Sequence, residues 1–251
     1  MLQIKNLQVR AGDKLILDKI NLDINTGQTQ AILGPNGSGK STLAKVLSGD
    51  PDYQVVQGQI NFLGQDLLKM STFERARAGI FLVFQDPVEI QGLSIASLLR
   101  SALGQKRKHL GLDQLADSDF LKLLKQKCSQ LGLPSDFYTK NVNENMSGGE
   151  KKMCELLQLA VLEPRLVIID EIDSGLDVDN FFKMVQGLQS LKKKDQSYLI
   201  ISHYQKFLEY LNPEIVNILL QGKIVKKGGF ELSQEIQKTG FTNLVTTNSQ
   251  D

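Results

Sequence analysis

The first quarter of the chain alternates between apolar and polar residues with the period of β-strands. Residues 2–9 are apolar at positions 2, 4, 7 and 9, and residues 20–24 are apolar at every second position. Successive side chains of a strand point to opposite faces, so this pattern predicts half-buried strands. A further short strand is predicted over residues 59–63, after a glycine. We therefore expect an antiparallel β portion at the N-terminal end of the fold.

A different pattern follows, in which short apolar runs alternate with helical segments. Residues 29–33 form an apolar run that leads into a glycine-rich turn and then into a helical stripe ending at Leu47. Later apolar runs of strand length lie at residues 80–84, 166–169 and 198–201. Strands that alternate with helices predict a mainly parallel sheet covered on both faces. The expected fold class is therefore α/β, with a mainly parallel core sheet beside the antiparallel portion.

Residues 93–145 interrupt this alternation with charged, amphipathic sequence. Apolar residues recur there at helical spacing from Phe120 to Leu131, and a glycine and a proline then end the pattern. We expect an inserted helical subdomain over residues 93–145, within a single domain of residues 1–251. The polar residues 242–251 are predicted to form a flexible tail.

The composition and charge are those of an ordinary globular protein. Of the 251 residues, 41% are hydrophobic and 23% are charged, which is close to average globular usage. Lys and Arg number 29 against 28 Asp and Glu, so the formal net charge is +1. With so little net charge, we expect no binding of nucleic acid and no attraction to an anionic membrane through the overall field. The longest apolar runs have the length of strands, so no direct membrane insertion is expected.

The cysteines and the basic residues have ordinary structural explanations. Cys128 and Cys154 have no Cys or His at metal-ligand spacing, and both occupy apolar positions of helical patterns, which predicts buried core thiols. No targeting pattern precedes the first strand, and two isolated cysteines favour a reducing, cytoplasmic location. The basic residues 106–109 could contact a polyanion or form a solvated helix end, and the second arrangement is the more common.

The strongest chemical motif begins directly after the predicted strand 29–33. It matches G-x-x-x-x-G-K-[ST] at every fixed position with Gly34, Pro35, Asn36, Gly37, Ser38, Gly39, Lys40 and Ser41. Glycines let backbone N–H groups turn inward around phosphate oxygens, and the following helix start adds positive potential. Lys40 is expected to neutralise the β- and γ-phosphates, and Ser41 to bind Mg²⁺. A glycine turn that only capped a helix would need neither side chain.

Two carboxylates follow the predicted core strand 166–169. Asp170 and Glu171 are placed at the carboxyl end of that strand, where open α/β sheets bind their ligands. Asp170 is the expected Mg²⁺ ligand. Glu171 is the expected general base, which polarises the water that attacks the γ-phosphate. The alternative, a pair of solvated acids at a strand end, is less favoured because the same chain contains the phosphate loop.

A second glycine-rich segment precedes the helix predicted over residues 153–161. Read locally, Ser147 and Glu150 form a capping box. Gly148 and Gly149 in the first turn each lower helix stability by about 1 kcal/mol relative to alanine, which indicates a close approach to the backbone. A phosphate is the obvious ligand. Capping and anion binding are compatible, because both use exposed N–H groups of one helix start.

Taken in order along nearly the whole chain, these motifs resemble those of the ABC ATPase family. The resemblance implies an ABC-type nucleotide-binding domain that binds ATP and Mg²⁺ and hydrolyses ATP to ADP and phosphate. It extends the phosphate loop to Thr42, and it implies that Gln85 binds Mg²⁺ and assists catalysis. It also implies nucleotide contacts by the signature residues Ser147, Gly148 and Gly149 and by Asp177, and a catalytic γ-phosphate contact by His203.

Within that family the sequence resembles the ATPase subunit of the SUF iron–sulfur cluster assembly machinery. The resemblance rests on residues 147–152, 170–177, 202–205 and 222–229. Transporter cassettes more often have Pro-Thr where Ile172 and Asp173 stand. The departures from the subfamily pattern are Asp86, where an aromatic residue is usual, and Met153 and Cys154, where Arg-Asn is usual.

The resemblance also implies partners. An ATP-dependent, transient, head-to-tail homodimer would reshape SUF scaffold subunits of the SufB-like and SufD-like kinds. Apolar Val88, Ile90 and Leu93, predicted to lie in a loop, either pack beneath the helical lobe or contact such a partner. The alternative function is the ATPase subunit of an ABC membrane transporter, supported by the cassette alone. A non-enzymatic nucleotide-binding regulator is disfavoured by the presence of Glu171 and His203.

Overall fold

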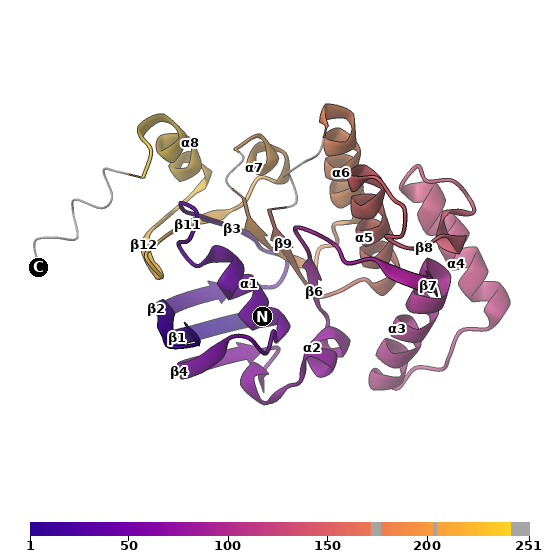
Figure 1. The fold of residues 1–251 in the computed structure, drawn as a ribbon, viewed down its shortest axis with the longest axis horizontal. Helices are drawn as coiled ribbons and strands as arrows, with labels where there is room; N and C mark the ends of the chain where they lie inside the picture. The colour runs from indigo at the N-terminus through magenta and orange to yellow at the C-terminus, as the bar shows by residue number, and fades with distance from the viewer. Residues whose placement is uncertain (172–176, 203–204, 242–251) are drawn as a thin grey trace, which may run out of the picture.

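A six-stranded sheet runs through the middle of the molecule (Figure 1). The computed structural model describes residues 1–171, 177–202 and 205–241. The strand order is β12-β11-β3-β10-β9-β6, and all neighbours are parallel except β12, which is antiparallel to β11. The strands are β3 (Thr29–Leu33), β6 (Ile80–Val83), β9 (Leu166–Asp170), β10 (Ser197–Ile201), β11 (Ile215–Leu220) and β12 (Lys223–Gly228). The predicted α/β class with a mainly parallel core sheet is confirmed.

A four-stranded antiparallel sheet lies beside it, in the order β2-β1-β4-β5. Its strands are β1 (Leu2–Ala11), β2 (Lys14–Ile24), β4 (Gln54–Phe62) and β5 (Gln65–Asp66). The predicted strand over residues 59–63 therefore begins too late. Gly58 lies inside β4 with φ 101°, and a Cβ there would come within 2.6 Å of the Leu7 Cα on β1. This glycine marks a shift of register between the two strands rather than the end of one.

The two faces of the six-stranded sheet are buried in separate cores. Ala31 and Leu33 of β3 pack with residues of α3 (Ile95–His109), α4 (Asp117–Gln130) and α5 (Gly148–Leu162). Ile32, between them, packs with α1 (Lys40–Ser48) and the antiparallel sheet. This alternation follows from the period of a strand. It places α1 and α5 on opposite faces of the central sheet.

The remaining helices are α2 (Thr72–Ala78), α6 (Val178–Leu191), α7 (Gln205–Leu211) and α8 (Phe230–Thr239), with short 3₁₀ turns η1 (Leu67–Lys69) and η2 (Phe137–Thr139). Cys128 and Cys154 are both buried, as predicted. Across the described parts of the chain, no helix is both long enough and apolar enough to cross a membrane.

The range 93–145 contains α3 and α4, and an antiparallel pair of short strands, β7 (Ile90–Ser94) and β8 (Asn141–Val142), joins its two ends. The prediction that Ile90 and Leu93 lie in a loop is wrong, because both belong to β7. Such a short pair has no periodic sequence signal. The side chain of Leu93 packs partly buried against the core, whereas Ile90 is 41% exposed and Val88, which precedes the strand, is 74% exposed.

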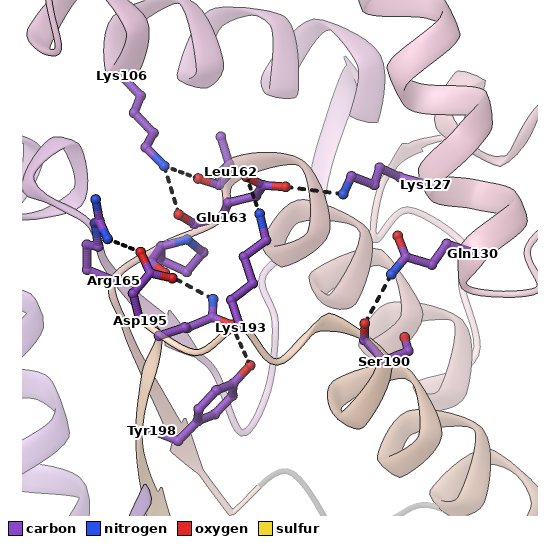
Figure 2. Close-up of polar contacts among 12 residues, drawn as sticks. Lys106, Lys127, Gln130, Leu162, Glu163, Arg165, Ser190, Lys193, Asp195 and Tyr198 are labelled. Atoms are coloured by element: carbon purple, nitrogen blue, oxygen red, sulfur yellow. Dashed lines mark hydrogen bonds and ion pairs between the residues drawn. The ribbon is translucent and has the colours of Figure 1, made fainter. Parts of the chain in front are cut away.

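The C-terminal end of α5 connects the helical region to the core. Figure 2 shows the Glu163 side chain between two lysines, with Lys127 Nζ of α4 at 3.2 Å and Lys193 Nζ at 2.7 Å from its carboxylate oxygens. Lys106 of α3 donates to the carbonyl oxygens of Leu162 and Glu163. Lysines are favourable at the end of a helix, where carbonyl groups lack intrahelical partners. The basic residues 106–109 form the last turn of α3, which is the helix-end arrangement.

Candidate nucleotide-binding site

The loop between β3 and α1 packs its backbone tightly against a neighbouring strand. A Cβ at Gly34 would come within 2.1 Å of the Leu219 carbonyl oxygen on β11, so only glycine fits there. Gly39 precedes α1 with φ 106°, a left-handed conformation that favours glycine. No side chain caps this helix start, and no acidic residue lies in its first turn. The positive end of α1 is therefore left to an anion.

Ser38 provides an independent test of whether this loop fits a phosphate. Its residue is 3% exposed, and its buried Oγ has no hydrogen-bond partner among the described residues. Buried polar atoms are normally hydrogen-bonded, and an orphaned one calls for an explanation. A hydroxyl donor beside inward-turning N–H groups matches the oxygens of a phosphate. The exposed loop residues Pro35, Asn36 and Gly37 precede it.

Lys40 lies inside the loop that precedes it. The residue is 4% exposed, and Nζ donates to the carbonyl oxygens of Gly34 at 2.9 Å and Pro35 at 3.0 Å. Burial lowers the pKa of the Lys40 ammonium, and the nearby Glu171 and Asp170 carboxylates oppose that shift. The ammonium is thus held at the mouth of a helix whose own potential is positive, which makes the loop strongly attractive for a polyanion.

The carboxylate predicted to bind a metal contacts the serine predicted to do the same. Ser41 Oγ, in the first turn of α1, donates to Asp170 Oδ1 at 3.0 Å. Asp170 ends β9 and is 6% exposed; burial raises the pKa of its carboxyl group, and the Ser41 hydrogen bond opposes the shift. In residues 1–171, 177–202 and 205–241, no three His, Cys, Asp or Glu side chains gather as a metal cluster. A hydroxyl and a single carboxylate fit Mg²⁺, which protein sites commonly bind together with waters and substrate phosphates.

Glu171 lies next to these groups and takes an unusual backbone conformation. Its φ is 46°, uncommon for a residue with a side chain, and its N–H donates to the Ile201 carbonyl oxygen at 2.8 Å. One carboxylate oxygen accepts from Gln85 Nε2 at 3.4 Å, and the other lies 3.9 Å from Lys40 Nζ. The structure thus brings together Lys40, Ser41, Gln85, Asp170 and Glu171, although they come from three separate parts of the sequence.

Asp177 and His203 are the remaining predicted nucleotide contacts outside the phosphate loop and the signature residues. Asp177 is the N-cap of α6, where its carboxylate accepts from the backbone N–H and the side-chain amide of Asn180 at 2.8 and 2.7 Å. Its pKa is lowered, chiefly by that backbone hydrogen bond. His203 lies outside the described residues, directly after Ser202, which follows β10. The identity of its contacts stays a prediction.

The start of α5 is a capping box. Ser147 Oγ accepts from the Glu150 N–H at 3.3 Å, and the Glu150 carboxylate accepts from the Ser147 N–H at 3.0 Å. A Cβ at Gly149 would come within 2.5 Å of the Asn180 side chain on α6, so this glycine has a reason within the chain. Ser147 and Gly148 are exposed. Helix packing therefore gives one reason for the close approach inferred at Gly149, and the phosphate contact of both glycines stays a prediction.

Two charged residues at the site's edge were not predicted. Lys152 and Glu155 lie on α5 with exposures of 4% and 3%, and both contact the backbone of Phe84. The sequence did contain a signal. The helix is apolar on the stripe that includes Leu156 and Ala160, and also at Leu159 beside it, which indicates that most of its sides are buried. Charged residues on such a helix are expected to be paired.

Comparison with known proteins gives a consistent picture. The family model for ABC transporters matches residues 17–174. The chain is 46% identical over 241 residues to the probable ATP-dependent transporter SufC of Escherichia coli K12, covering 96% of this chain and 97% of that protein. A probable ATP-dependent transporter of Synechocystis is 47% identical over 96% of this chain and 94% of its own.

Solved structures with the same fold are more distant in sequence. A nucleotide-free ATP-binding cassette from an ABC transporter superposes with a TM-score of 0.76 at 23% identity, covering 98% of this chain and 97% of that one. A dimeric post-hydrolysis state of an ATP-binding cassette bound to ADP and Pi gives a TM-score of 0.77 at 20% identity, with coverages of 92% and 99%. At these identities the likeness concerns the fold.

Proposed function

Because this chain belongs to the ABC transporter family and is an ABC ATPase of the SufC type, we propose that it hydrolyses Mg²⁺-bound ATP at the site formed by Lys40 and Glu171. The observation that carries this assignment is the meeting of Lys40, Ser41, Gln85, Asp170 and Glu171 at the carboxyl ends of parallel strands. Residues Gly34 to Thr42 hold the phosphates, with Ser38 Oγ as a further donor.

In the proposed reaction, Glu171 accepts a proton from water while the water oxygen attacks the γ-phosphorus and the bond to the ADP oxygen breaks. Lys40 stabilises the charge on the β- and γ-phosphate oxygens. Mg²⁺, when held by Ser41, Asp170 and Gln85, supplies further positive charge to those oxygens. His203 contacts the γ-phosphate as a second catalytic group.

Substitution of the base tests this assignment. Glu171→Gln keeps the size and the Gln85 contact of the side chain but cannot accept the proton, so kcat should fall at least about a hundredfold while ATP still binds. Steady-state phosphate release and equilibrium binding of a fluorescent ATP analogue measure the two quantities. Unchanged turnover would assign the base to another residue.

We further propose that two chains pair head to tail on ATP. Ser147, Gly148 and Gly149 of one chain, with Asp177, would meet the nucleotide held by Gly34 to Thr42 of the other. Two observations support this. The α1 and α5 helices cover opposite faces of the central sheet, and Ser147 and Gly148 at the start of α5 are exposed. A second helix start would supply N–H donors to the open side of the γ-phosphate.

The partners we propose are the SufB-like and SufD-like scaffold subunits of a SUF iron–sulfur cluster assembly complex in the cytoplasm. Support comes from the SufC relative and from a cleft of about 410 Å³ lined in part by Phe84, Val88 and Ile90. These three apolar side chains are 52%, 74% and 41% exposed. Exposed apolar residues around one cleft are typical of a protein interaction surface.

The second candidate is a membrane transporter's ATPase subunit, which the names of the relatives, probable ATP-dependent transporters, favour. Affinity purification of the tagged chain distinguishes the two by recovering soluble, cysteine-bearing scaffolds or membrane proteins. Val88→Asp should weaken scaffold binding by about 2 kcal/mol or more, the scale of an interface hot spot. Val56→Asp is the matched control, because Val56 is also exposed but lies on β4. Equal binding by both variants would exclude the cleft as the docking site.

A further inference from the structure

A buried ion pair lies one turn inside α5, close to the catalytic residues but outside the set described above. Lys152 Nζ and Glu155 Oε2 are 3.5 Å apart, and the two side chains are 5% and 4% exposed. Burial is the largest influence on both: it lowers the pKa of the Lys152 ammonium and raises the pKa of the Glu155 carboxyl to about 7. Such a pair is weak evidence for stability, because desolvation offsets much of the attraction between the charges.

Within the described part of the chain, the other hydrogen bonds of this pair go to the backbone of two residues. Lys152 Nζ donates to the carbonyl oxygen of Phe84 and, at 2.7 Å, to that of Gln85. Glu155 Oε1 accepts from the Phe84 N–H at 2.9 Å. Strand β6 ends at Val83, so the backbone N–H and carbonyl group of Phe84 bond to these side chains and not to a neighbouring strand. They hold the chain at the point where it leaves the sheet.

The segment after Gln85 is tied to the same part of the molecule. Lys151 Nζ of α5 lies 2.8 Å from a Glu89 carboxylate oxygen, and Asn143 Nδ2, just before α5, donates to the Val88 carbonyl oxygen at 2.8 Å. Residues 84–89 are therefore connected to the beginning of α5 at several points. The side chain of Gln85 leaves this segment toward Glu171.

From these contacts we infer that Lys152 and Glu155 are positioning residues, which fix the backbone at Phe84 and Gln85 so that the Gln85 amide meets Glu171. They act through Gln85 and do not touch the reacting atoms. Since α5 begins at Gly148, directly after its N-cap Ser147, the pair also connects the exposed helix start to the carboxylate that we propose as the base. The inference rests on the proposed function, because it assigns a purpose to the contact between Gln85 and Glu171.

Two substitutions test the inference. Lys152→Met removes the donor, Glu155→Met removes the acceptor, and each keeps a flexible apolar stem. Both release the backbone of Phe84, so we expect kcat to fall about tenfold while the dissociation constant for a fluorescent ATP analogue changes less than about twofold. Melting temperatures are measured on the same samples.

A double-mutant cycle separates positioning from a structural effect. In the native background, Gln85→Ala should lower kcat. In the Lys152→Met background the same change should have little further effect, because Gln85 is already misplaced. Equal losses in both backgrounds would overturn the inference, as would a fall in melting temperature with kcat unchanged per folded molecule. If Lys152→Met does not fold, the same cycle with Glu155→Met decides.

Lys127→Met is the matched control. It also removes a lysine from an ion pair near α5, but at the Glu163 end shown in Figure 2. Its kcat should remain native, and a loss equal to that of Lys152→Met would show that any broken ion pair of α5 has this effect. The Glu171→Gln variant reports separately on the proposed function. If its turnover were native, Glu171 would not be the base, and the proposed function would fail independently of the double-mutant cycle.

Discussion

Two helix starts in this molecule, those of α1 and α5, use the same positive end in opposite ways. At α1 the preceding residue is Gly39, no side chain caps the helix, and Lys40 adds a buried cation. At α5 the Ser147 hydroxyl and the Glu150 carboxylate form a complete capping box. A helix start has four N–H groups without intrahelical partners. The first start leaves them to a ligand, whereas the second satisfies part of them internally.

The difference has a consequence for binding. The α1 start has a cation, a Ser38 hydroxyl with no hydrogen-bond partner among the described residues, and no acid in its first turn, so it can hold a triphosphate by itself. The α5 start has an acid in its first turn, so its attraction for a free anion is weak. It suits a phosphate that another chain has already bound and partly neutralised. This asymmetry is what a head-to-tail dimer requires.

The largest effect should come from removing the cation at α1. Lys40→Ala deletes the ammonium that faces the phosphates, and we expect kcat/KM to fall by about a thousandfold or more. Phosphate release and ATP binding measure the loss. Lys69→Ala, which removes an exposed lysine on η1, is the control and should behave as native. Near-normal hydrolysis by Lys40→Ala would show that the start of α1 does not hold the triphosphate.

A charge placed at the α5 start should act on the dimer alone. Gly148→Asp puts a carboxylate at an exposed first-turn position, where it favours the helix of the free chain but repels a phosphate. ATP affinity of the monomer should change less than about twofold, and ATP-driven dimers should weaken at least about tenfold. Light scattering with ATP in the Glu171→Gln background measures the dimer, with Gly148→Asn as the neutral control of equal size. Dimers of native strength would show that this helix start does not meet the nucleotide.

The same contrast explains how far the sequence could predict the site. The α1 loop is local, because its glycines, lysine and serine are consecutive, and Asp170 and Glu171 follow a recognisable core strand. Their meeting follows from one rule, that the carboxyl ends of parallel strands share an edge. Gln85 was placed only through resemblance to a family.

What the sequence did not predict depends on packing between distant segments. Lys152 and Glu155 contact Phe84 about seventy residues away along the chain, and no periodicity encodes such a contact. The strand at Ile90 was missed for the same reason. Gly149 was interpreted through a ligand, and no sequence pattern indicated that it also lies against the Asn180 side chain of α6. A glycine signals a close approach, and only the fold tells what approaches.

A smaller effect is expected when each helix start loses its serine. Ser147→Ala removes the cap of α5 and should reduce the free energy of unfolding by about 1 kcal/mol, which lowers the melting temperature by about 2–4 °C in a domain of this size. Ser38→Ala removes a hydroxyl that has no hydrogen-bond partner in the described part of the chain, so stability should not fall, but ATP affinity should. Calorimetry and ATP binding on both variants check this crossed result. Equal destabilisation by the two substitutions would contradict the comparison.

The smallest expected effect concerns the acid at the α5 start. A hydrogen bond from Lys140, at 2.8 Å, is the main cause that lowers the pKa of Glu150 from 4.5 to about 2, with further help from the Ser147 N–H. Because the folded state has the lower pKa, the contribution to stability is complete above about pH 4.5 and is lost as the pH falls toward 2. The side chain is 41% exposed, so solvent screening limits the effect to about 0.5 kcal/mol.

Glu150→Gln should therefore be less stable than the native chain at pH 6 and nearly equal to it at pH 2.5, with the difference reduced by salt. Thermal unfolding of both proteins at the two pH values measures this. The α1 start offers no acid with such a dependence, since its first turn contains none. If the difference in stability between the two proteins stayed constant with pH, the Glu150 side chain would stabilise the fold by its shape and not by its charge. The capping box would then differ from the α1 start in geometry only.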